Sequence, residues 1–174
     1  MSHEQVRHRF CISQRSTRYV DENESPWVQH PVVTAFIEDK RGKISTDPNQ
    51  ADIGTIMGVA RENCNTVYVN TVDQLQKWLI ARGVDKGTAR KQARGAARGW
   101  LGNALCTELL FSAPINMWAA MLRLRCNPAA DAEIRVMYAE VLRSLKQSKY
   151  ASYFEKMTLV PSPDGIGEAL HEEK

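Results

Sequence analysis

The longest periodic segment of the chain begins at Ala51. From there to Leu79, apolar side chains recur at steps of three and four residues, the spacing that places them on one face of a helix. The pattern predicts one long amphipathic helix, with Asn65 as the point where it could break. The members of the stripe are Ile53, Ile56, Met57, Ala60, Cys64, Val67, Tyr68, Thr71, Leu75, Trp78 and Leu79.

Three further helices are expected after this one. Gly83 marks a turn, and Thr88 can cap a short helix rich in Ala and Arg that runs to about Arg98. Asn127 as N-cap, followed by Pro128, opens the last of the three. In the second of the three, Trp118, Met121, Leu122 and Arg125 share one face. In the third, the apolar face consists of Ile134, Met137, Tyr138, Val141, Leu142 and Leu145.

The remaining segments lack helical periodicity. Residues 20–50 are polar and rich in Pro and Asp, so we expect loops and a hairpin there and no helix. The apolar stretch 105–111 fits either a strand or a short buried segment. Periodicity is lost after Lys149. We therefore predict a single domain over residues 1–160 and a flexible C-terminal tail over residues 161–174.

Composition excludes several classes of protein. The 174 residues are enough for one domain with a sizeable core, and no apolar run approaches the ~20 residues of a membrane span. Charged residues occupy the N-terminus where a signal peptide would be apolar, which favours a cytoplasmic protein. The net charge of +3 does not require a nucleic-acid partner, and the four cysteines and four histidines show no metal-ligand spacing. We expect no membrane, nucleic-acid or metal partner.

The densest basic cluster lies at the N-terminus. Arg7, His8 and Arg9 are followed by the segment 13–19, which is rich in hydroxyl and basic side chains. Guanidinium groups bind phosphate through two parallel hydrogen bonds, and nearby hydroxyls orient the ligand. The cluster therefore indicates a phosphorylated ligand, and a solvated basic arm is the alternative.

Two other sets of arginines stand out. Arg90, Arg94 and Arg98 are spaced by four and share one helix face, which is most often solvated surface. Arg123 and Arg125 point to opposite sides of their helix, and Arg125 shares its face with apolar residues. A half-buried guanidinium needs a partner, so Arg125 either binds a ligand or forms an ion pair with Asp131 or Glu133.

Three blocks of sequence, in order, resemble the flavin-dependent thymidylate synthases, the ThyX family. The first is Arg7-His8-Arg9 followed, one residue closer than is usual in the family, by Ser16-Thr17-Arg18-Tyr19. The second is KQARGAARGWLGNA (91–104), and the third is LRLRCNPAADAEIR (122–135). The resemblance implies an α/β, helix-dominated fold with a small sheet, assembled as a homotetramer with shared active sites.

The resemblance also implies roles for individual residues. Arg7, His8 and Arg9 match the triplet that contacts FAD. A loop would hold the dUMP phosphate and sugar, and its residues are Gln14, Arg15, Ser16, Thr17 and Arg18. Arg7 and Arg98 would be further nucleotide contacts. Arg125 would activate the uracil ring at N3.

Some positions depart from the family pattern. The flavin-contacting Thr-x-Asn-x-Arg aligns with residues 112–116, so Pro114 and Asn116 replace its Asn and Arg. Ala120 stands at another polar flavin-contacting position, and a Leu-Pro pair becomes Leu101-Gly102. Relative to the family pattern we expect a chain that is short at its N-terminus.

The resemblance predicts an enzyme that methylates dUMP to dTMP. The one-carbon unit would come from methylenetetrahydrofolate and the electrons from NADPH through FAD, without a cysteine nucleophile. Two alternatives remain: a pyrimidine nucleotide hydroxymethylase of the same fold, and a non-catalytic paralogue that binds nucleotide.

Overall fold

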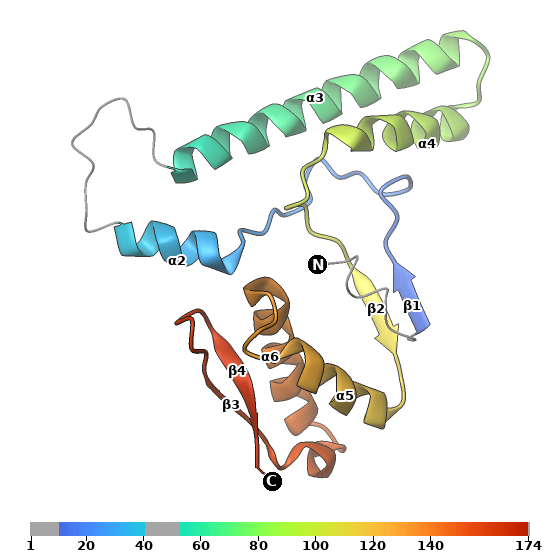
Figure 1. The fold of residues 1–174 in the computed structure, drawn as a ribbon. Coiled ribbons are helices and arrows are strands. Elements are labelled where there is room, and N and C mark those ends of the chain that lie inside the picture. The colour runs from blue at the N-terminus through green and yellow to red at the C-terminus, as the bar shows by residue number, and fades with distance from the viewer. Residues whose placement is uncertain (1–10, 41–52, 174) are drawn as a thin grey trace. The chain divides into compact units, whose positions relative to one another are not determined.

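The computed structural model describes residues 11–40 and 53–173 (Figure 1). These residues form two compact units. One comprises 11–13, 30–39 and 110–173, and is called the core unit here; the other comprises 14–29, 40 and 53–109, and is called the helical-hairpin unit. Within the described residues, no helix is both long enough and apolar enough to cross a membrane.

Most of the described chain is helical, as the sequence predicts. The α-helices are α2 (Pro31–Lys40), α3 (Ile53–Ala81), α4 (Lys86–Ala97), α5 (Ile115–Arg125) and α6 (Ala132–Lys146), with short 3₁₀ turns η1 (Arg98–Trp100) and η2 (Ala151–Phe154). Strand β1 (Cys11–Gln14) pairs with β2 (Leu109–Ser112), and β3 (Met157–Pro161) pairs with β4 (Glu168–Glu172). The sheet content is therefore small, as expected.

Helix α3 is the long helix expected from the periodicity, and it is continuous. The predicted break at Asn65 is wrong, because the helix continues through this residue. The Asn65 side chain donates to the carbonyl and side-chain oxygens of Asn23 and not to the backbone of its own helix. The apolar stripe expected on this helix is mostly not buried within the described chain. Tyr68 is the one fully buried residue of α3, whereas Ile56 and Trp78 are 54% and 55% exposed.

Helix α4 follows a tight turn and packs along α3. Gly83 has a φ of +86°, a conformation that glycine adopts without steric cost. The N-cap is Asp85 and not the predicted Thr88: the Asp85 carboxylate accepts from the Gly87 and Thr88 N–H groups, both at 3.0 Å. One face of α4 consists of three alanines with no exposed surface, Ala89, Ala93 and Ala97.

The core unit is built around large side chains of α5 and α6. The predicted stripe of α6 is confirmed, since its members either are buried or pack against the buried cluster. That cluster consists of Met121, Leu122, Cys126, Ile134, Tyr138, Leu142, Phe154 and Met157.

Two predictions for the core unit are wrong. Residues 31–40, where no helix was expected, form helix α2. Pro31 can begin this helix because its fixed φ suits the first helical turn. The ring of His30 accepts from the Val32 N–H at 3.3 Å. Helix α6 starts at Ala132 with Asp131 as N-cap. The predicted cap, Asn127, instead accepts from the Ala129 N–H in the preceding turn.

Much of the segment assigned from the sequence to a flexible tail forms an antiparallel hairpin. Met157 pairs with Glu172, and Pro161 pairs with Glu168. Ala169 in β4 has no exposed surface. Arg135 of α6, 1% exposed, holds the hairpin turn by donating to Asp164 at 2.6 Å and to the Ile166 carbonyl at 2.9 Å. A periodic pattern is not recognisable in this segment because each strand has only five residues.

Candidate active site

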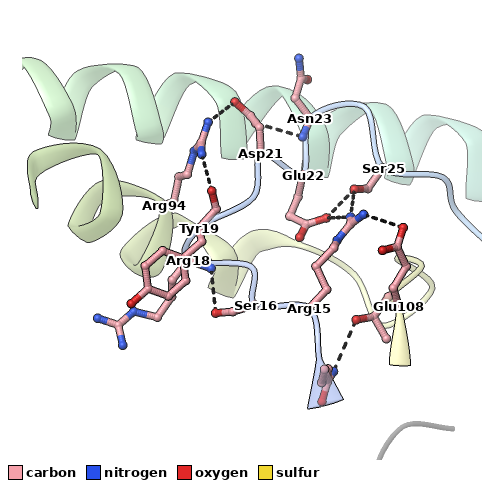
Figure 2. A network of polar contacts seen from close by, with 12 residues as sticks. Arg15, Ser16, Arg18, Tyr19, Asp21, Glu22, Asn23, Ser25, Arg94 and Glu108 are labelled. Carbon is pink, nitrogen blue, oxygen red and sulfur yellow. Dashed lines mark hydrogen bonds and ion pairs between the residues drawn. The ribbon is translucent and has the colours of Figure 1, made fainter. Parts of the chain in front are cut away.

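The segment 14–25 is held against α3 and α4 by polar contacts (Figure 2). Arg15 lies at the centre: one terminal nitrogen donates to Glu22 at 2.9 Å and to Ser25 at 2.7 Å, and the other donates to Glu108 at 3.2 Å. The Ser25 hydroxyl donates to Glu22 at 2.5 Å. Because Glu22 is 1% exposed, Arg15 balances a buried carboxylate, and its hydrogen-bonding groups face the protein.

Two residues of α3 lie beneath this segment. The Tyr68 hydroxyl accepts from the Glu22 N–H at 3.4 Å, and burial raises the pKa of this phenol. Asn65 donates to Asn23 at 3.1 Å. The segment is therefore anchored along its length to α3, although its own sequence shows no regular element.

Helix α4 contributes two cations to the same segment. Arg94 donates to Asp21 at 2.7 Å and to the Tyr19 carbonyl at 3.0 Å, as Figure 2 shows. The Lys91 ammonium lies 4.6 Å from the centre of the Tyr19 ring. Hydrogen bonding and charge from Lys91, with a smaller effect of Arg18, lower the pKa of Tyr19. Arg94 thus has a structural role as the ion-pair partner of Asp21, unlike Arg90 and Arg98 on the same helix face.

The remaining cations of this surface face solvent. Arg18 is exposed, and its stem passes over α4 at Gly95, where an added Cβ would lie 3.6 Å from it. Arg90 and Arg98 are exposed as well. Among the residues that the structure describes, none of these three forms an ion pair. Their guanidinium groups can therefore reach an anionic ligand.

The other loop residues predicted to bind nucleotide lie beside Arg18. The Ser16 hydroxyl accepts from the Arg18 N–H at 3.4 Å, which turns the chain tightly at this point. Gln14 is exposed and donates to Thr107 at 3.5 Å. Thr17 is half-buried. The structure brings Gln14, Ser16, Thr17 and Arg18 together as neighbours along one short segment.

Arg125 belongs to the core unit, at the last residue of α5. It is half-buried, as its helix face predicts, and it lies close enough to Tyr138 to lower the pKa of that phenol. Burial has the larger, opposite effect, and the pKa of Tyr138 is raised to about 12. The phenol near Arg125 is therefore uncharged at neutral pH. Of the two acidic residues expected as alternative partners, Asp131 and Glu133, Asp131 caps α6 and contacts His30 at 3.2 Å.

The thiol next to Arg125 is unreactive. Cys126 has no exposed surface, and burial raises its pKa to about 11, with a smaller opposing effect from Arg135. A thiol in this state is protonated at neutral pH and is a poor nucleophile. Chemistry at Arg125 therefore cannot draw on a neighbouring thiolate.

His30, Asp131 and Glu133 form the one group of three possible metal ligands among the described residues. The His30 Nδ1 atom accepts from the Val32 N–H, so the proton of the neutral ring lies on Nε2, which faces Asp131. His30 and Asp131 thus already have partners at the starts of α2 and α6.

The predicted flavin contacts are mostly outside the described structure. Arg7, His8 and Arg9 lie outside the described residues. Asn116 is exposed in the first turn of α5, and its side-chain oxygen accepts from the Met117 N–H at 3.0 Å. The described part of the chain thus offers one polar side chain at the positions that the resemblance assigns to FAD.

Several residues that shape this surface had no signal in the sequence. Asp21, Glu22 and Ser25 belong to a segment that looks like an ordinary polar loop, and Glu108 lies within the apolar stretch 105–111. Their pairing with Arg15 and Arg94 depends on how distant segments of the chain meet. Sequence spacing could show which arginines share a face, but it could not show which of them already have a carboxylate partner.

The described residues define a helix-rich protein with solvent-facing guanidinium groups beside a hydroxyl-rich turn and, in its core unit, a half-buried arginine. Residues 1–148 match the model of the family described as thymidylate synthase complementing protein. The chain belongs to this family, the ThyX family, and the resemblance identified from the three sequence blocks is confirmed.

Relatives named flavin-dependent thymidylate synthase are similar over most of the chain. The protein from Mycobacterium marinum (strain ATCC BAA-535 / M) is 35% identical over 148 residues, which is 83% of this chain and 52% of the relative. The protein from Mycobacterium avium (strain 104) is 34% identical over 164 residues, which is 91% of this chain and 58% of the relative. The chain thus spans somewhat more than half the length of these curated relatives.

Proposed function

We propose that this protein methylates dUMP at C5 to give dTMP, with a one-carbon unit from methylenetetrahydrofolate. The observation that carries the proposal is the placement of Arg125, a half-buried guanidinium at the end of α5 beside the neutral phenol of Tyr138. A fixed cation in such a setting suits a planar, polarisable ring better than a solvated anion. The membership in the ThyX family supports the same substrate.

In the proposed reaction Arg125 binds the N3 and O2 edge of uracil. The guanidinium donates to O2 and, once N3 has lost its proton to solvent, also to N3, and so stabilises the negative charge that develops on the ring as C5 reacts. Because the Cys126 thiol is buried and protonated, ring activation relies on this charge and not on a covalent bond to that sulfur.

In the shared active sites that the family resemblance implies, the phosphate and sugar of dUMP are assigned to residues of the helical-hairpin unit. Arg18 and Arg98 are exposed and supply the charge, and Ser16, Thr17 and Gln14 supply shorter polar groups beside Arg18. Arg15 has a supporting part, because its terminal nitrogens already hold Glu22, Ser25 and Glu108. Arg7 remains a proposed nucleotide contact outside the described residues.

The described residues do not by themselves fit a flavin. Pro114 lacks a backbone N–H, Ala120 lacks a polar side chain, and the Asn116 side-chain oxygen already accepts from the Met117 N–H. The proposed FAD contacts are therefore Arg7, His8 and Arg9, with Asn116 at the margin. A flavin belongs to the proposal also through the relatives, which are named flavin-dependent, and NADPH as reductant belongs to it through the family resemblance.

A homo-oligomer, most simply a tetramer, is part of the proposal. Helix α3 exposes large apolar side chains along much of its length, which is costly in water and common at subunit contacts. Those more than a third exposed are Ile53, Ile56, Met57, Val59, Val67, Val69, Trp78 and Ile80. A second copy that covers this face would account for the exposed side of the predicted stripe.

The test is turnover by the purified full-length chain. The protein is incubated with dUMP, methylenetetrahydrofolate, NADPH and FAD, and the nucleotide product is identified by its mass. Formation of dTMP supports the proposal, and a product one oxygen heavier identifies the hydroxymethylase. Pro114 and Ala120, which replace polar flavin contacts of the family pattern, favour a second candidate function. This candidate is a non-catalytic nucleotide-binding paralogue, which would bind dUMP and form neither product.

A further inference from the structure

The β3–β4 hairpin lies beyond residue 148, where the family match ends. It is nevertheless part of the core unit. Met157 and Ala169 are 1% and 0% exposed, and Leu159 and Leu170 pack against the buried cluster that includes Leu122 and Cys126. The hairpin thus covers the helix that ends at Arg125.

Strand β4 contacts α5 on both sides of Arg125 in the sequence. Two residues before it, Arg123 donates from Nε and Nη2 to the two carboxylate oxygens of Glu172, both at 2.8 Å. One residue after it, the Cys126 carbonyl accepts from the Leu170 N–H at 2.8 Å. Carbonyls at a helix C-terminus have no partner within the helix, so this bond satisfies one and fixes the end of α5.

The bidentate pair is suited to fixing geometry. Two parallel hydrogen bonds between a guanidinium plane and a carboxylate define orientation as well as distance. The same contact lowers the pKa of Glu172, so the carboxylate stays ionised at neutral pH. The Arg125 side chain thus extends from a helix end that is held by β4, and the buried Tyr138 is close enough for Arg125 to affect its pKa.

We propose that Glu172 is a positioning residue for Arg125: through Arg123, and together with the Leu170–Cys126 hydrogen bond, it holds the last turn of α5 so that the Arg125 guanidinium is presented to the nucleotide base. The inference rests on the proposed function, since it gives the hairpin a part in binding dUMP. Glu172 itself does not contact the substrate.

The test compares two ion pairs of the same strand. Glu172→Gln places an amide NH₂ group against the Arg123 donors and removes the charge. Glu168→Gln does the same to the ion pair of Glu168 with Arg143 of α6, which does not flank Arg125. The exposed fractions of the two carboxylate side chains are 34% and 36%, so the variants are matched. The affinity for dUMP is measured by calorimetry and the melting temperature by calorimetric scanning.

Glu172→Gln should weaken dUMP binding about tenfold, the lower end of the loss seen when a supporting hydrogen bond behind a ligand-binding group is removed. Glu168→Gln should bind dUMP within about twofold of the unchanged protein, although both variants melt at similarly lowered temperatures. The exchanged pair, Arg123→Glu with Glu172→Arg, should recover most of the affinity that Arg123→Glu alone loses.

Equal dUMP affinities for Glu172→Gln and Glu168→Gln would overturn the inference and leave the proposed function standing. A Glu172→Gln chain that does not fold would also overturn it, because Glu172 would then be required for folding. If the unchanged protein folds but does not bind dUMP, the proposed function fails, and this inference fails with it. The two failures are therefore distinguishable.

Discussion

The two units of this protein are packed in opposite ways. In the core unit, α5 and α6 bury large side chains such as Leu122, Tyr138 and Phe154, each no more than 1% exposed. In the helical-hairpin unit, α4 meets α3 through Ala89 and Ala93, which have no exposed surface and leave no room for anything larger. The core unit is stabilised by filled volume, and the helical-hairpin unit by close approach of two backbones.

The arginines differ between the units in a related way. Arg15 and Arg94 in the helical-hairpin unit have carboxylate partners at 2.9 Å and 2.7 Å and hold a loop in place. Arg125 in the core unit is half-buried and close enough to Tyr138 to affect the pKa of that phenol. The comparison teaches that arginines singled out by the same kind of motif can lie in very different surroundings. These differences predict that the two units respond differently to mutation.

The largest effect should come from Arg125→Lys, and it should fall on turnover. A lysine stem still covers the neighbouring apolar side chains, so folding should be preserved. The ammonium cannot form two parallel bonds to the uracil edge, and loss of such a donor costs about 100-fold to 1000-fold in turnover. Steady-state rates of dTMP formation measure the loss.

Arg143→Lys is the control for this variant. Arg143 also belongs to the core unit and is half-exposed, but its partners are Glu140 and Glu168. A lysine there should leave turnover within about twofold, as expected for an exposed ion pair. Full activity of Arg125→Lys would remove Arg125 from the catalytic machinery.

Leu122→Ala should destabilise the core unit by about 2–5 kcal/mol, because it opens a cavity in a fully buried cluster. Leu124→Ala is the matched control, since Leu124 lies on the same helix and is 55% exposed. Urea unfolding gives both free energies. Similar losses for the two variants would contradict a core built on filled volume.

Ala93→Leu should cost about 1–3 kcal/mol, because the larger side chain must push α4 away from α3. Ala96→Leu, on the exposed side of α4, should be close to neutral. Chemical denaturation followed by far-ultraviolet circular dichroism reports on both. A stabilising Ala93→Leu would show that the helices are not closely packed at this seam.

The smallest effect concerns acid stability at the hairpin turn. The neighbouring Ser162 hydroxyl, the Ile166 N–H and the Arg135 guanidinium hold the pKa of Asp164 down to about 2. Since the folded pKa lies below that of the unfolded chain, the stabilisation is complete above about pH 5 and is lost as the pH falls towards 2. The melting temperature of Asp164→Asn should therefore approach that of the unchanged protein over this range. A constant difference in melting temperature would contradict the assignment.

The sequence predicted the helices well where the apolar spacing was regular. The stripe of α6 from Ile134 to Leu145 was placed correctly, and so was the extent of α3. It failed for short elements, because five-residue strands such as β3 carry too few residues for a periodic signal. It also did not show how much of the apolar face of α3 is buried, since helical periodicity marks such a face but does not identify what covers it.

The candidate site was only partly predictable. Motif spacing singled out Arg18, Arg98 and Arg125, and the structure finds the first two exposed and the third half-buried. It could not separate Arg94 from Arg98, which share a helix face, because the separation depends on Asp21 from a distant segment. Pairing between loops is a tertiary property, and no local pattern encodes it.

The most direct test of the central claim is a calorimetric comparison of dUMP with deoxyuridine. If exposed Arg18 binds the phosphate, dUMP should bind more tightly by about one to two decades, the contribution of a charge-assisted hydrogen bond, and the difference should shrink in added salt. Arg18→Ala should remove most of this preference, and Arg90→Ala should keep it. Equal binding of dUMP and deoxyuridine by the unchanged protein would contradict the assignment of this surface to a nucleotide phosphate.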